Sequence, residues 1–236
     1  MVRVLVTRPG PGASRTAGLL EAQGFQPILV PLTQTVALGV ESSPRNAAAV
    51  AVTSANAVRH APKALIATLA ALPCHAVGKR TAEACRAVGF SSVSEGPGDA
   101  AALADAIAGD LAGKAIVYLC GRVRFPAFEA RLAAAGVRVE AIETYDTVEI
   151  DYDDADVLER LSNEPVEAAL LYSAKAAAAL TKLIGRSGLR HLFETTEFLA
   201  LSNRVAAPLA KIVDRKIRIA TQPDEEALLG LLTSPR

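Results

Sequence analysis

Short apolar runs alternate along the chain with longer amphipathic stretches, and Gly, Pro or Ser follows most of the runs. Continuous apolar runs of this length are typical of strands buried on both faces of a parallel sheet. The predicted strands are Val2–Thr7, Gln26–Pro31, Val50–Thr53, Cys74–Val77, Ser91–Ser94, Lys114–Leu119, Val137–Ile142, Val166–Tyr172, Phe198–Leu201 and Lys216–Ala220.

Helices are predicted between these strands from their start and stop residues. Ser14 is expected to cap a helix that runs to about Gln23, and Pro62 should interrupt and restart the helical stretch opened by Ser54. The acidic run Glu149–Asp156 predicts a solvated loop and a helix start. The other predicted helices are Lys79–Val88, Asp99–Leu111, Phe125–Ala135, Ala174–Ile184, Leu189–Phe193, Arg204–Val213 and Pro223–Leu232. This alternation predicts an α/β fold with parallel sheets flanked by helices.

The sequence repeats itself at low similarity. Val50–Asn56 resembles Ala169–Lys175, and His75–Ala82 resembles Leu199–Ala206. The spacing from Gly24 to Thr35 also equals the spacing from Gly136 to Thr147. We therefore expect two similar lobes with a cleft between them, and ligands of such sheets bind beyond the carboxyl ends of the strands.

Polar and basic residues follow the predicted strands, mostly at helix starts. Helix N-termini offer free N–H groups and a positive dipole end, which suits a ligand with several carboxylates or phosphates. For any one of these residues ordinary helix capping is the favoured explanation, but six such strand ends together favour anion binding. The candidate binding residues are Arg8, Pro9, Thr53, Ser54, Asn56, Gly78, Lys79, Arg80, Thr81, Arg122, Tyr172, Ser173, Ala174, Lys175, Ser202, Asn203 and Arg204.

Composition and charge limit the kinds of partner and the cell compartment that we expect for this protein. The formal net charge is +0, so there is no bulk attraction to nucleic acid or an anionic membrane. Three cysteines without a CxxC pair argue against a disulfide framework and fit a reducing compartment. No apolar run approaches the ~20 residues of a membrane span, and the N-terminal run is too short for a signal peptide. We expect a soluble cytoplasmic protein that binds neither nucleic acid nor membrane.

The sequence lacks the motifs of several common kinds of cofactor, metal and catalytic site. The chain has no glycine-rich dinucleotide or phosphate loop, and the two prolines after the first strand remove amide donors, so we expect no nucleotide cofactor. His60, His75 and His191 lack metal-ligand spacing, so no metal is expected; His75 is interpreted as structural, the other two as surface residues. Cys120 is interpreted as a small buried residue. Tyr145 is either a proton donor or a packing residue.

Four motifs together resemble one known family. Val4–Pro9, Val52–Val58, Val77–Ala82 and Ile142–Tyr145 are similar to motifs of the uroporphyrinogen-III synthase family. Tyr172-Ser173 and Leu201–Ala206 also fall where that family has motifs, so the resemblance extends over essentially the whole chain.

The resemblance implies an architecture and a reaction. One lobe would comprise residues 1–34 plus 149–236 and the other residues 39–142, joined by a two-stranded linker at residues 35–38 and 143–148. The family is a cyclising lyase of haem biosynthesis that uses no cofactor or metal. It converts the linear tetrapyrrole hydroxymethylbilane to uroporphyrinogen III, with loss of water and inversion of ring D through a spiro intermediate.

The resemblance also assigns roles to residues. Tyr145 matches the linker tyrosine proposed as general acid, and Thr81 matches a threonine of the first cleft motif. Val205 stands where many members have a hydroxyl residue, which leaves backbone amides and Arg204 for binding there. A monomer is expected, with transient contact to the preceding pathway enzyme. The alternative is a cytoplasmic two-lobed binding or sensor module for a small polyanionic ligand, which would bind without turnover.

Overall fold

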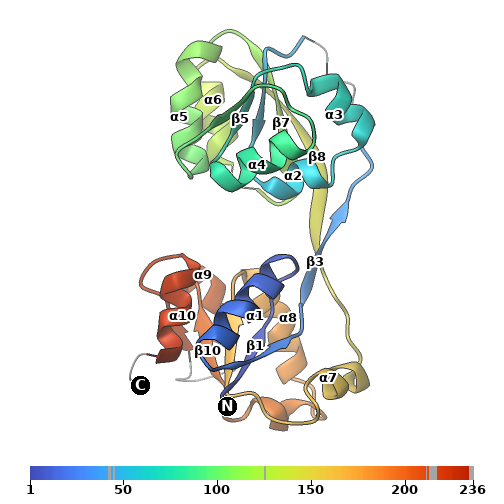
Figure 1. The fold of residues 1–236 in the computed structure, drawn as a ribbon, viewed down its shortest axis with the longest axis vertical. Coiled ribbons are helices and arrows are strands. Elements are labelled where there is room, and N and C mark those ends of the chain that lie inside the picture. Colours follow the sequence, from blue (N-terminus) through green and yellow to red (C-terminus); the bar gives the residue numbers. More distant parts are fainter. Residues whose placement is uncertain (42–43, 45, 125, 211, 213–216, 234–236) are drawn as a thin grey trace. The chain divides into compact units, whose positions relative to one another are not determined.

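The computed structural model describes residues 1–41, 44, 46–124, 126–210, 212 and 217–233. The chain divides into two compact units: a first unit of Met1–Gln34 with Val148–Arg236, and a second unit of Thr35–Thr147. Each unit has one sheet with helices on both faces (Figure 1). The predicted α/β fold with two lobes and mostly parallel sheets is confirmed.

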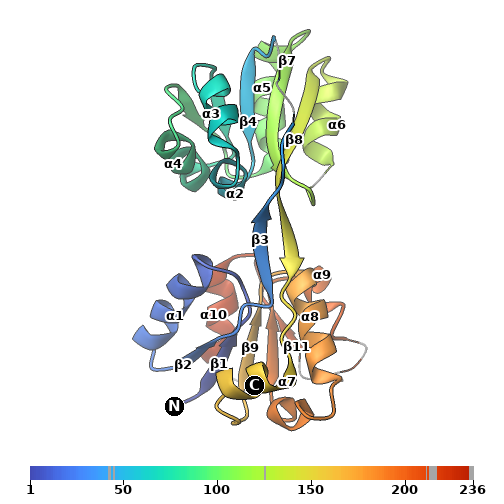
Figure 2. The ribbon, with the colours of Figure 1, turned by 90° about the vertical axis from the view of Figure 1, so that its right-hand side faces the viewer.

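The first unit contains a five-stranded parallel sheet in the order β11-β10-β9-β1-β2. Alternate residues of each strand face opposite sides, as the pleat requires. Val4 and Val6 pack with α1 and α10, whereas Leu5 packs on the opposite face with α7, α8 and α9 (Figure 2). The elements are β1 (Arg3–Val6), α1 (Gly12–Ala22), β2 (Gln26–Leu29), α7 (Asp154–Arg160), β9 (Ala168–Leu171), α8 (Ala174–Ile184), a 3-10 helix η1 (Arg190–Phe193), β10 (Glu197–Ala200), α9 (Asn203–Ala206), β11 (Ile217–Ile219) and α10 (Glu225–Thr233).

The second unit contains most of a six-stranded sheet in the order β3-β8-β7-β4-β5-β6. Ala51 and Tyr118 pack with α5 and α6, and Val50 and Val117 pack with α2, α3 and α4 on the other face (Figure 2). Burying each such Val side chain is worth about 1.5 to 3 kcal/mol. The elements are β3 (Thr33–Ala37), β4 (Ala49–Val52), α2 (Ala55–Arg59), α3 (Lys63–Leu69), β5 (Cys74–Ala76), α4 (Lys79–Ala87), β6 (Val93–Glu95), α5 (Ala100–Leu111), β7 (Ala115–Gly121), α6 (Ala127–Ala134) and β8 (Arg138–Glu149).

The two units share one topology, which confirms the duplication seen in the sequence. The order β6-β5-β4-β7-β8 of the second unit corresponds strand for strand to β11-β10-β9-β1-β2 of the first. Gly24 and Gly136, the matched glycines that follow α1 and α6, have φ of 81° and 77°. Glycine adopts this left-handed conformation at no steric cost, so it ends both helices in the same way.

Strands β3 and β8 are neighbours, and the chain passes from one unit to the other within them. The Leu38 N–H donates to the Thr144 carbonyl at 2.9 Å, and the Ile150 N–H donates to the Leu32 carbonyl at 3.1 Å. Leu38 thus pairs with Thr144, and the earlier Leu32 pairs with the later Ile150, so the two segments run antiparallel. The sequence pattern predicted a strand that ends at Ile142. In the structure this strand continues through the polar stretch that follows, as β8.

Two predicted helices differ from the structure in their bounds. The first helix begins at Gly12 rather than after Ser14, because Pro11 supplies the N-cap position without a side-chain hydrogen bond. The helix predicted at Arg204–Val213 is only the short α9, and turns follow it to residue 210. The predicted ends at Phe125, Val213 and Lys216 lie outside the described residues.

Candidate active site

The predicted binding residues lie at the carboxyl edges of the two sheets. In the second unit they follow β4, β5 and β7, which are adjacent parallel strands, so this edge gathers Thr53–Asn56, Gly78–Thr81 and Arg122. In the first unit they follow the adjacent strands β1, β9 and β10. Each unit therefore presents one polar edge, and the residues gathered in the first unit are Arg8, Pro9, Tyr172, Ser173, Ala174, Lys175, Ser202, Asn203 and Arg204.

Three of the predicted hydroxyls cap helices. Ser54 Oγ accepts the Asn56 N–H at 3.3 Å, Ser173 Oγ accepts the Ala176 N–H at 3.1 Å, and Ser202 Oγ accepts the Val205 N–H at 3.4 Å. Such capping satisfies N–H groups that the helix leaves unpaired and is worth about 1 kcal/mol. The capping interpretation thus holds for these three residues, whatever they also bind.

Thr53 satisfies a buried hydroxyl. Its Oγ1 is 2.7 Å from the hydroxyl of Tyr118, which is 1% exposed and packs on Phe128. Burial raises the pKa of Tyr118 to about 12, so the phenol is neutral and needs a hydrogen-bond partner. The hydroxyl of Thr53 therefore has a structural role at this edge.

Tyr145 is directed by a β-bulge in β8. Cys120 pairs with Glu143, but the next residue, Gly121, pairs with Tyr145, so Thr144 is the extra residue. Thr144 is fully buried, and its Oγ1 donates to the Ala57 carbonyl at 2.7 Å. Strict alternation along β8 would place the tyrosine on the face of α5 and α6. The bulge instead turns it onto the face of α2, α3 and α4, beside the cluster that contains Ile142.

The phenol of Tyr145 extends along α2 to its first turn. Its hydroxyl donates a 3.1 Å hydrogen bond to Ser54 Oγ, at the carboxyl edge of the sheet. The side chain is half-buried and packs over Gly121. The hydrogen bond to Ser54 therefore holds the phenol of Tyr145, a group that can donate a proton, at the carboxyl edge of the sheet.

His60 is a residue of this site that the sequence did not single out. The sequence indicated a surface residue, and in the structure His60 is half-buried. Its ring stacks on that of Tyr145, with centroids 5.9 Å apart and planes at 27°. Its Nε2 lies 2.9 Å from the Thr35 hydroxyl of β3. Pro62 signalled in the sequence that α2 ends near His60. No sequence signal indicated that His60 contacts Tyr145.

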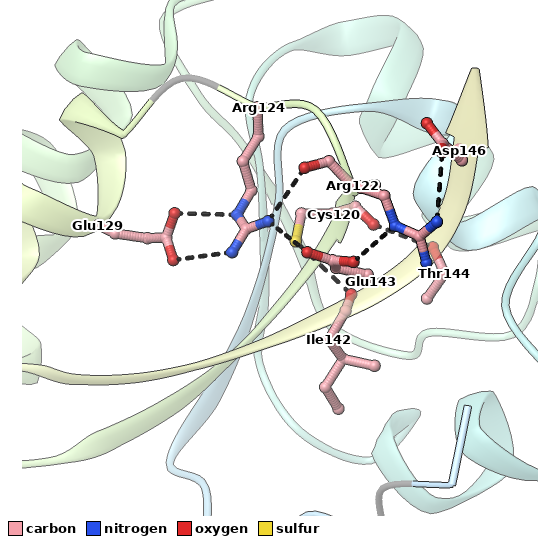
Figure 3. A network of polar contacts seen from close by, with 8 residues as sticks. All are labelled: Cys120, Arg122, Arg124, Glu129, Ile142, Glu143, Thr144 and Asp146. Carbon is pink, nitrogen blue, oxygen red and sulfur yellow. Dashed lines mark hydrogen bonds and ion pairs between the residues drawn. The ribbon is translucent and has the colours of Figure 1, made fainter. Parts of the chain in front are cut away.

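Arginines and carboxylates surround the bulge (Figure 3). Arg122 pairs with Glu143 at 3.3 Å and with Asp146 at 3.4 Å, and so spans the extra residue. Arg124 pairs with Glu143 at 2.8 Å and with Glu129 at 3.0 Å. Exposed pairs are worth about 0 to 1 kcal/mol each, but two arginines that share Glu143 join β8 to the segment after β7 as a network.

The corresponding edge of the first unit centres on Glu225, the first residue of α10. Its carboxylate accepts hydrogen bonds from Arg8 at 2.8 Å, Arg15 at 2.5 Å, Thr16 at 2.6 Å and Tyr172 at 3.2 Å. Burial disfavours its charged form, but these hydrogen bonds and the two arginine charges outweigh that cost and lower the pKa of Glu225. No local sequence signal pointed to Glu225, because it lies 217 positions along the chain from Arg8.

Arg8 also packs on Tyr172, with its guanidinium carbon 4.1 Å from the ring centroid. Burial raises the pKa of Tyr172, so its phenol is neutral and donates to Glu225. Both predicted residues are thus brought together, and both engage the carboxylate of Glu225 in this structure.

The matched positions Thr81 and Val205 are both buried, with 6% and 4% exposed. They occupy the first turns of α4 and α9, whose N-caps are Gly78 and Ser202. A side chain at this position packs against its own lobe, so Val205 is accommodated without an unpaired polar atom. Lys79, Arg80, Asn203 and Arg204 are exposed beside them, and Lys175 is half-buried.

The remaining nucleophile and histidine candidates are structural. Cys120 is 1% exposed, and burial raises its pKa to about 12, so it is a neutral thiol. His75 bonds to Ser94 Oγ at 2.8 Å, and burial lowers its pKa. Within the described ranges, no group of three or more His, Cys, Asp or Glu residues has a metal-binding arrangement. None of the helices in the part of the chain that the structure describes is long and apolar enough to cross a membrane.

Comparison with known proteins identifies the family. The family model for uroporphyrinogen-III synthase HemD matches residues 14–230. The solved structure of uroporphyrinogen-III synthetase from Helicobacter pylori is similar over 100% of both chains, with a TM-score of 0.67 and 18% identity. A mutant uroporphyrinogen III synthase from the extremely thermophilic bacterium Thermus thermophilus has a TM-score of 0.50 and 20% identity, covering 99% of this chain and 98% of that one. The search of curated proteins found no match.

At these identities the solved structures show a shared fold, whereas the family model covers nearly the whole sequence. The alternative of a binding or sensor module is not favoured, because the matching family is one of enzymes. The chain belongs to the uroporphyrinogen-III synthase family.

Proposed function

We propose that this chain carries out its family's reaction, the cyclisation of hydroxymethylbilane to uroporphyrinogen III, with Tyr145 as the proton donor. The family's reaction is that of a cyclising hydro-lyase in haem biosynthesis. The observation that supports Tyr145 is its placement: the bulge at Thr144 brings its hydroxyl to Ser54 at the edge where parallel strands end.

The chemistry needs one proton at the start and releases one at the end. The hydroxyl of the substrate's hydroxymethyl group leaves as water when Tyr145 protonates it, and the electron-rich pyrrole stabilises the carbocation that remains. The substituted carbon of the last ring attacks this cation to give the spiro intermediate. The spiro centre then opens and closes again with ring D inverted, and the ring proton lost on closure restores the balance. A phenol suits this exchange because it both donates and accepts a proton.

The acetate and propionate groups of the substrate need anion-binding groups. The polar edges offer N–H groups at the starts of α4, α8 and α9, together with the basic side chains of Lys79, Arg80, Lys175 and Arg204. The entropy lost when a flexible bilane adopts a closed shape is a large part of the activation barrier, and the enzyme lowers the barrier by binding that shape. We therefore assign most of the catalytic effect to substrate positioning, and we assign the isomer outcome to the inversion of the last ring.

The reaction is a dehydration and rearrangement with no net oxidation, so the proposal includes no cofactor. We further propose that the enzyme is a monomer in the cytoplasm, that residues 1–34 with 149–236 and 39–142 act as its lobes, and that residues 35–38 and 143–148 act as the linker. Transient transfer of substrate from the preceding pathway enzyme fits a linear tetrapyrrole that closes spontaneously.

A product assay tests the proposal. Purified protein is incubated with hydroxymethylbilane, and the porphyrin isomers are separated after oxidation. The type III isomer is expected in excess over a reaction without protein. The type I isomer alone, which forms spontaneously, would refute the activity. Substrate binding without type III product would instead support the binding-module alternative.

A further inference from the structure

The Gly121 backbone lies beneath the phenol of Tyr145. A Cβ atom built on Gly121 would lie 2.7 Å from Cζ, 2.9 Å from the hydroxyl oxygen and 3.0 Å from Cε1 of that ring. Carbon atoms in ordinary contact are separated by about 3.5 to 4.0 Å. No side chain larger than a hydrogen is compatible with the present position of the phenol.

The backbone of Gly121 does not itself require glycine. Its φ lies outside the left-handed region, in contrast to those of Gly24 and Gly136. Glycine inside or at the end of a strand weakens it, and such a glycine often marks a bulge or a close approach. Here it marks both, because Gly121 is the residue that pairs with Tyr145 immediately after the bulge.

The atoms that a Cβ would meet belong to the far end of a side chain. The strand β7 therefore tolerates the added methyl group, and the phenol moves instead. This distinguishes Gly121 from Gly96, where a Cβ would meet the Ala76 carbonyl at 2.7 Å and the backbone would have to shift. Displacement of the ring breaks the 3.1 Å hydrogen bond to Ser54 and disturbs the stack on His60.

We propose that Gly121 is a positioning residue for catalysis: its missing side chain sets where the Tyr145 hydroxyl lies at the strand edge. The inference rests on the proposed function of Tyr145, because it acts through that phenol. It adds to that function a second residue, on another strand, which acts through the ring of Tyr145.

The test compares Gly121→Ala with Gly109→Ala, a glycine of α5 with no atom within 4 Å of its added Cβ. Gly121→Ala is expected to lower kcat roughly 10- to 100-fold with little change in KM, because misplacement of a reacting group by about 1 Å has effects of this size. Gly109→Ala is expected to keep the wild-type kcat. A Gly121→Ala variant with wild-type kcat would overturn the proposal.

Two double variants separate this role from a merely structural one. In the Tyr145→Phe background, Gly121→Ala should lower kcat little further, since the proton donor is already gone; an undiminished further loss would overturn the proposal. In the Tyr145→Ala background the methyl group meets no ring, so the drop in unfolding midpoint that Gly121→Ala causes in the wild type should disappear. This midpoint readout needs no activity, so it tests the contact even if the type III isomer is not formed. An equal drop in both backgrounds would also overturn the proposal.

Discussion

The hydroxyl of Tyr145 donates a 3.1 Å hydrogen bond to the Oγ of Ser54, and the same Oγ caps α2 by accepting the Asn56 N–H. One serine therefore holds both a helix start and the proposed proton donor. Its two bonds have separable consequences, because the cap affects stability and the bond to the phenol affects the position of a proton.

Replacement of Ser54 by Ala tests this double role. Loss of the cap should lower the free energy of unfolding by about 1 kcal/mol. Asp153→Ala is the matched control, since Asp153 caps α7 by accepting the Asp156 N–H at 2.8 Å and is not among the predicted site residues. Both variants should lose similar stability in urea unfolding, but only Ser54→Ala should also lower kcat. Equal kcat in the two variants would reduce Ser54 to a cap.

Tyr145→Phe removes the phenol proton and keeps the ring. We expect kcat to fall roughly 100-fold, at the lower end of the range for a general acid, because the pyrrole itself assists departure of the hydroxyl. Tyr152→Phe is the control, since the Tyr152 hydroxyl donates to the Pro31 carbonyl at 3.1 Å and takes no part in the proposed chemistry. Each variant should lose about 1 kcal/mol of stability. Wild-type kcat in Tyr145→Phe would return the tyrosine to a packing role.

His60 supports the ring of Tyr145 from α2. His60→Ala removes the stacked ring, a contact worth about 0.5 to 1.5 kcal/mol, and should lower kcat several-fold with KM nearly unchanged. His60→Phe keeps a stacked ring but loses the hydrogen bond to Thr35, so it should retain most of kcat. Steady-state kinetics of His60→Ala and His60→Phe tests whether the ring at position 60 supports Tyr145. A raised KM at constant kcat in His60→Ala would place the imidazole among the substrate-binding groups instead.

Most of the regular fold follows from local signals. Apolar runs identified the strands, Gly24 and Gly136 marked two helix ends, and Pro62 separated α2 from α3. These signals are readable from the sequence because each residue influences the backbone only within a few positions of its own. The repeat between the chain's two parts then predicted the lobes, since both use the same strand order.

The bulge at Thr144 was not predictable from the pattern. A bulge exchanges one strand pairing for another of similar energy, and no local composition requires it. The contact of Glu225 with Arg8 likewise joins residues 217 positions apart. Gly121 was the one usable sign, because a glycine at a strand end suggests close approach of another group. Sequence patterns therefore located the edge of the site, whereas side-chain directions came only from pairing between distant strands.

Two arginines of the predicted binding set should behave differently. The guanidinium of Arg122 pairs with Glu143 and Asp146, which hold it beside the bulge. Arg80 lies in the first turn of α4, beside the N–H groups of the helix start that attract an anion. Losing a charge-assisted bond to a substrate carboxylate costs about 1.5 kcal/mol or more, so Arg80→Ala should raise KM roughly tenfold. Arg122→Ala should leave KM near that of the wild type. Similar rises in KM for both variants would contradict this distinction and place Arg122 on the substrate.

The lowered pKa of Glu225 makes part of the stability depend on pH. The folded carboxyl binds its proton more weakly than the unfolded one, so its contribution is present above the unfolded pKa and is lost as pH falls through the folded pKa. Glu225→Gln should therefore lower the free energy of unfolding by about 1 to 2 kcal/mol at neutral pH, because Arg8 and Arg15 lose a charged partner. The gap between variant and wild type should stay constant down to about pH 5 and should narrow as the pH falls below the unfolded pKa of about 4.3 and through the lower folded pKa.

Urea unfolding at several pH values measures this gap. Glu226→Gln is the control, since Glu226 is the next residue of α10 and is exposed. Its stability should follow that of the wild type at every pH. A gap for Glu225→Gln that stays constant as the carboxyl titrates would mean that shape, rather than charge, joins Glu225 to Arg8. A gap that narrows on acidification would show that this edge of the first unit is held together by an ionised carboxylate.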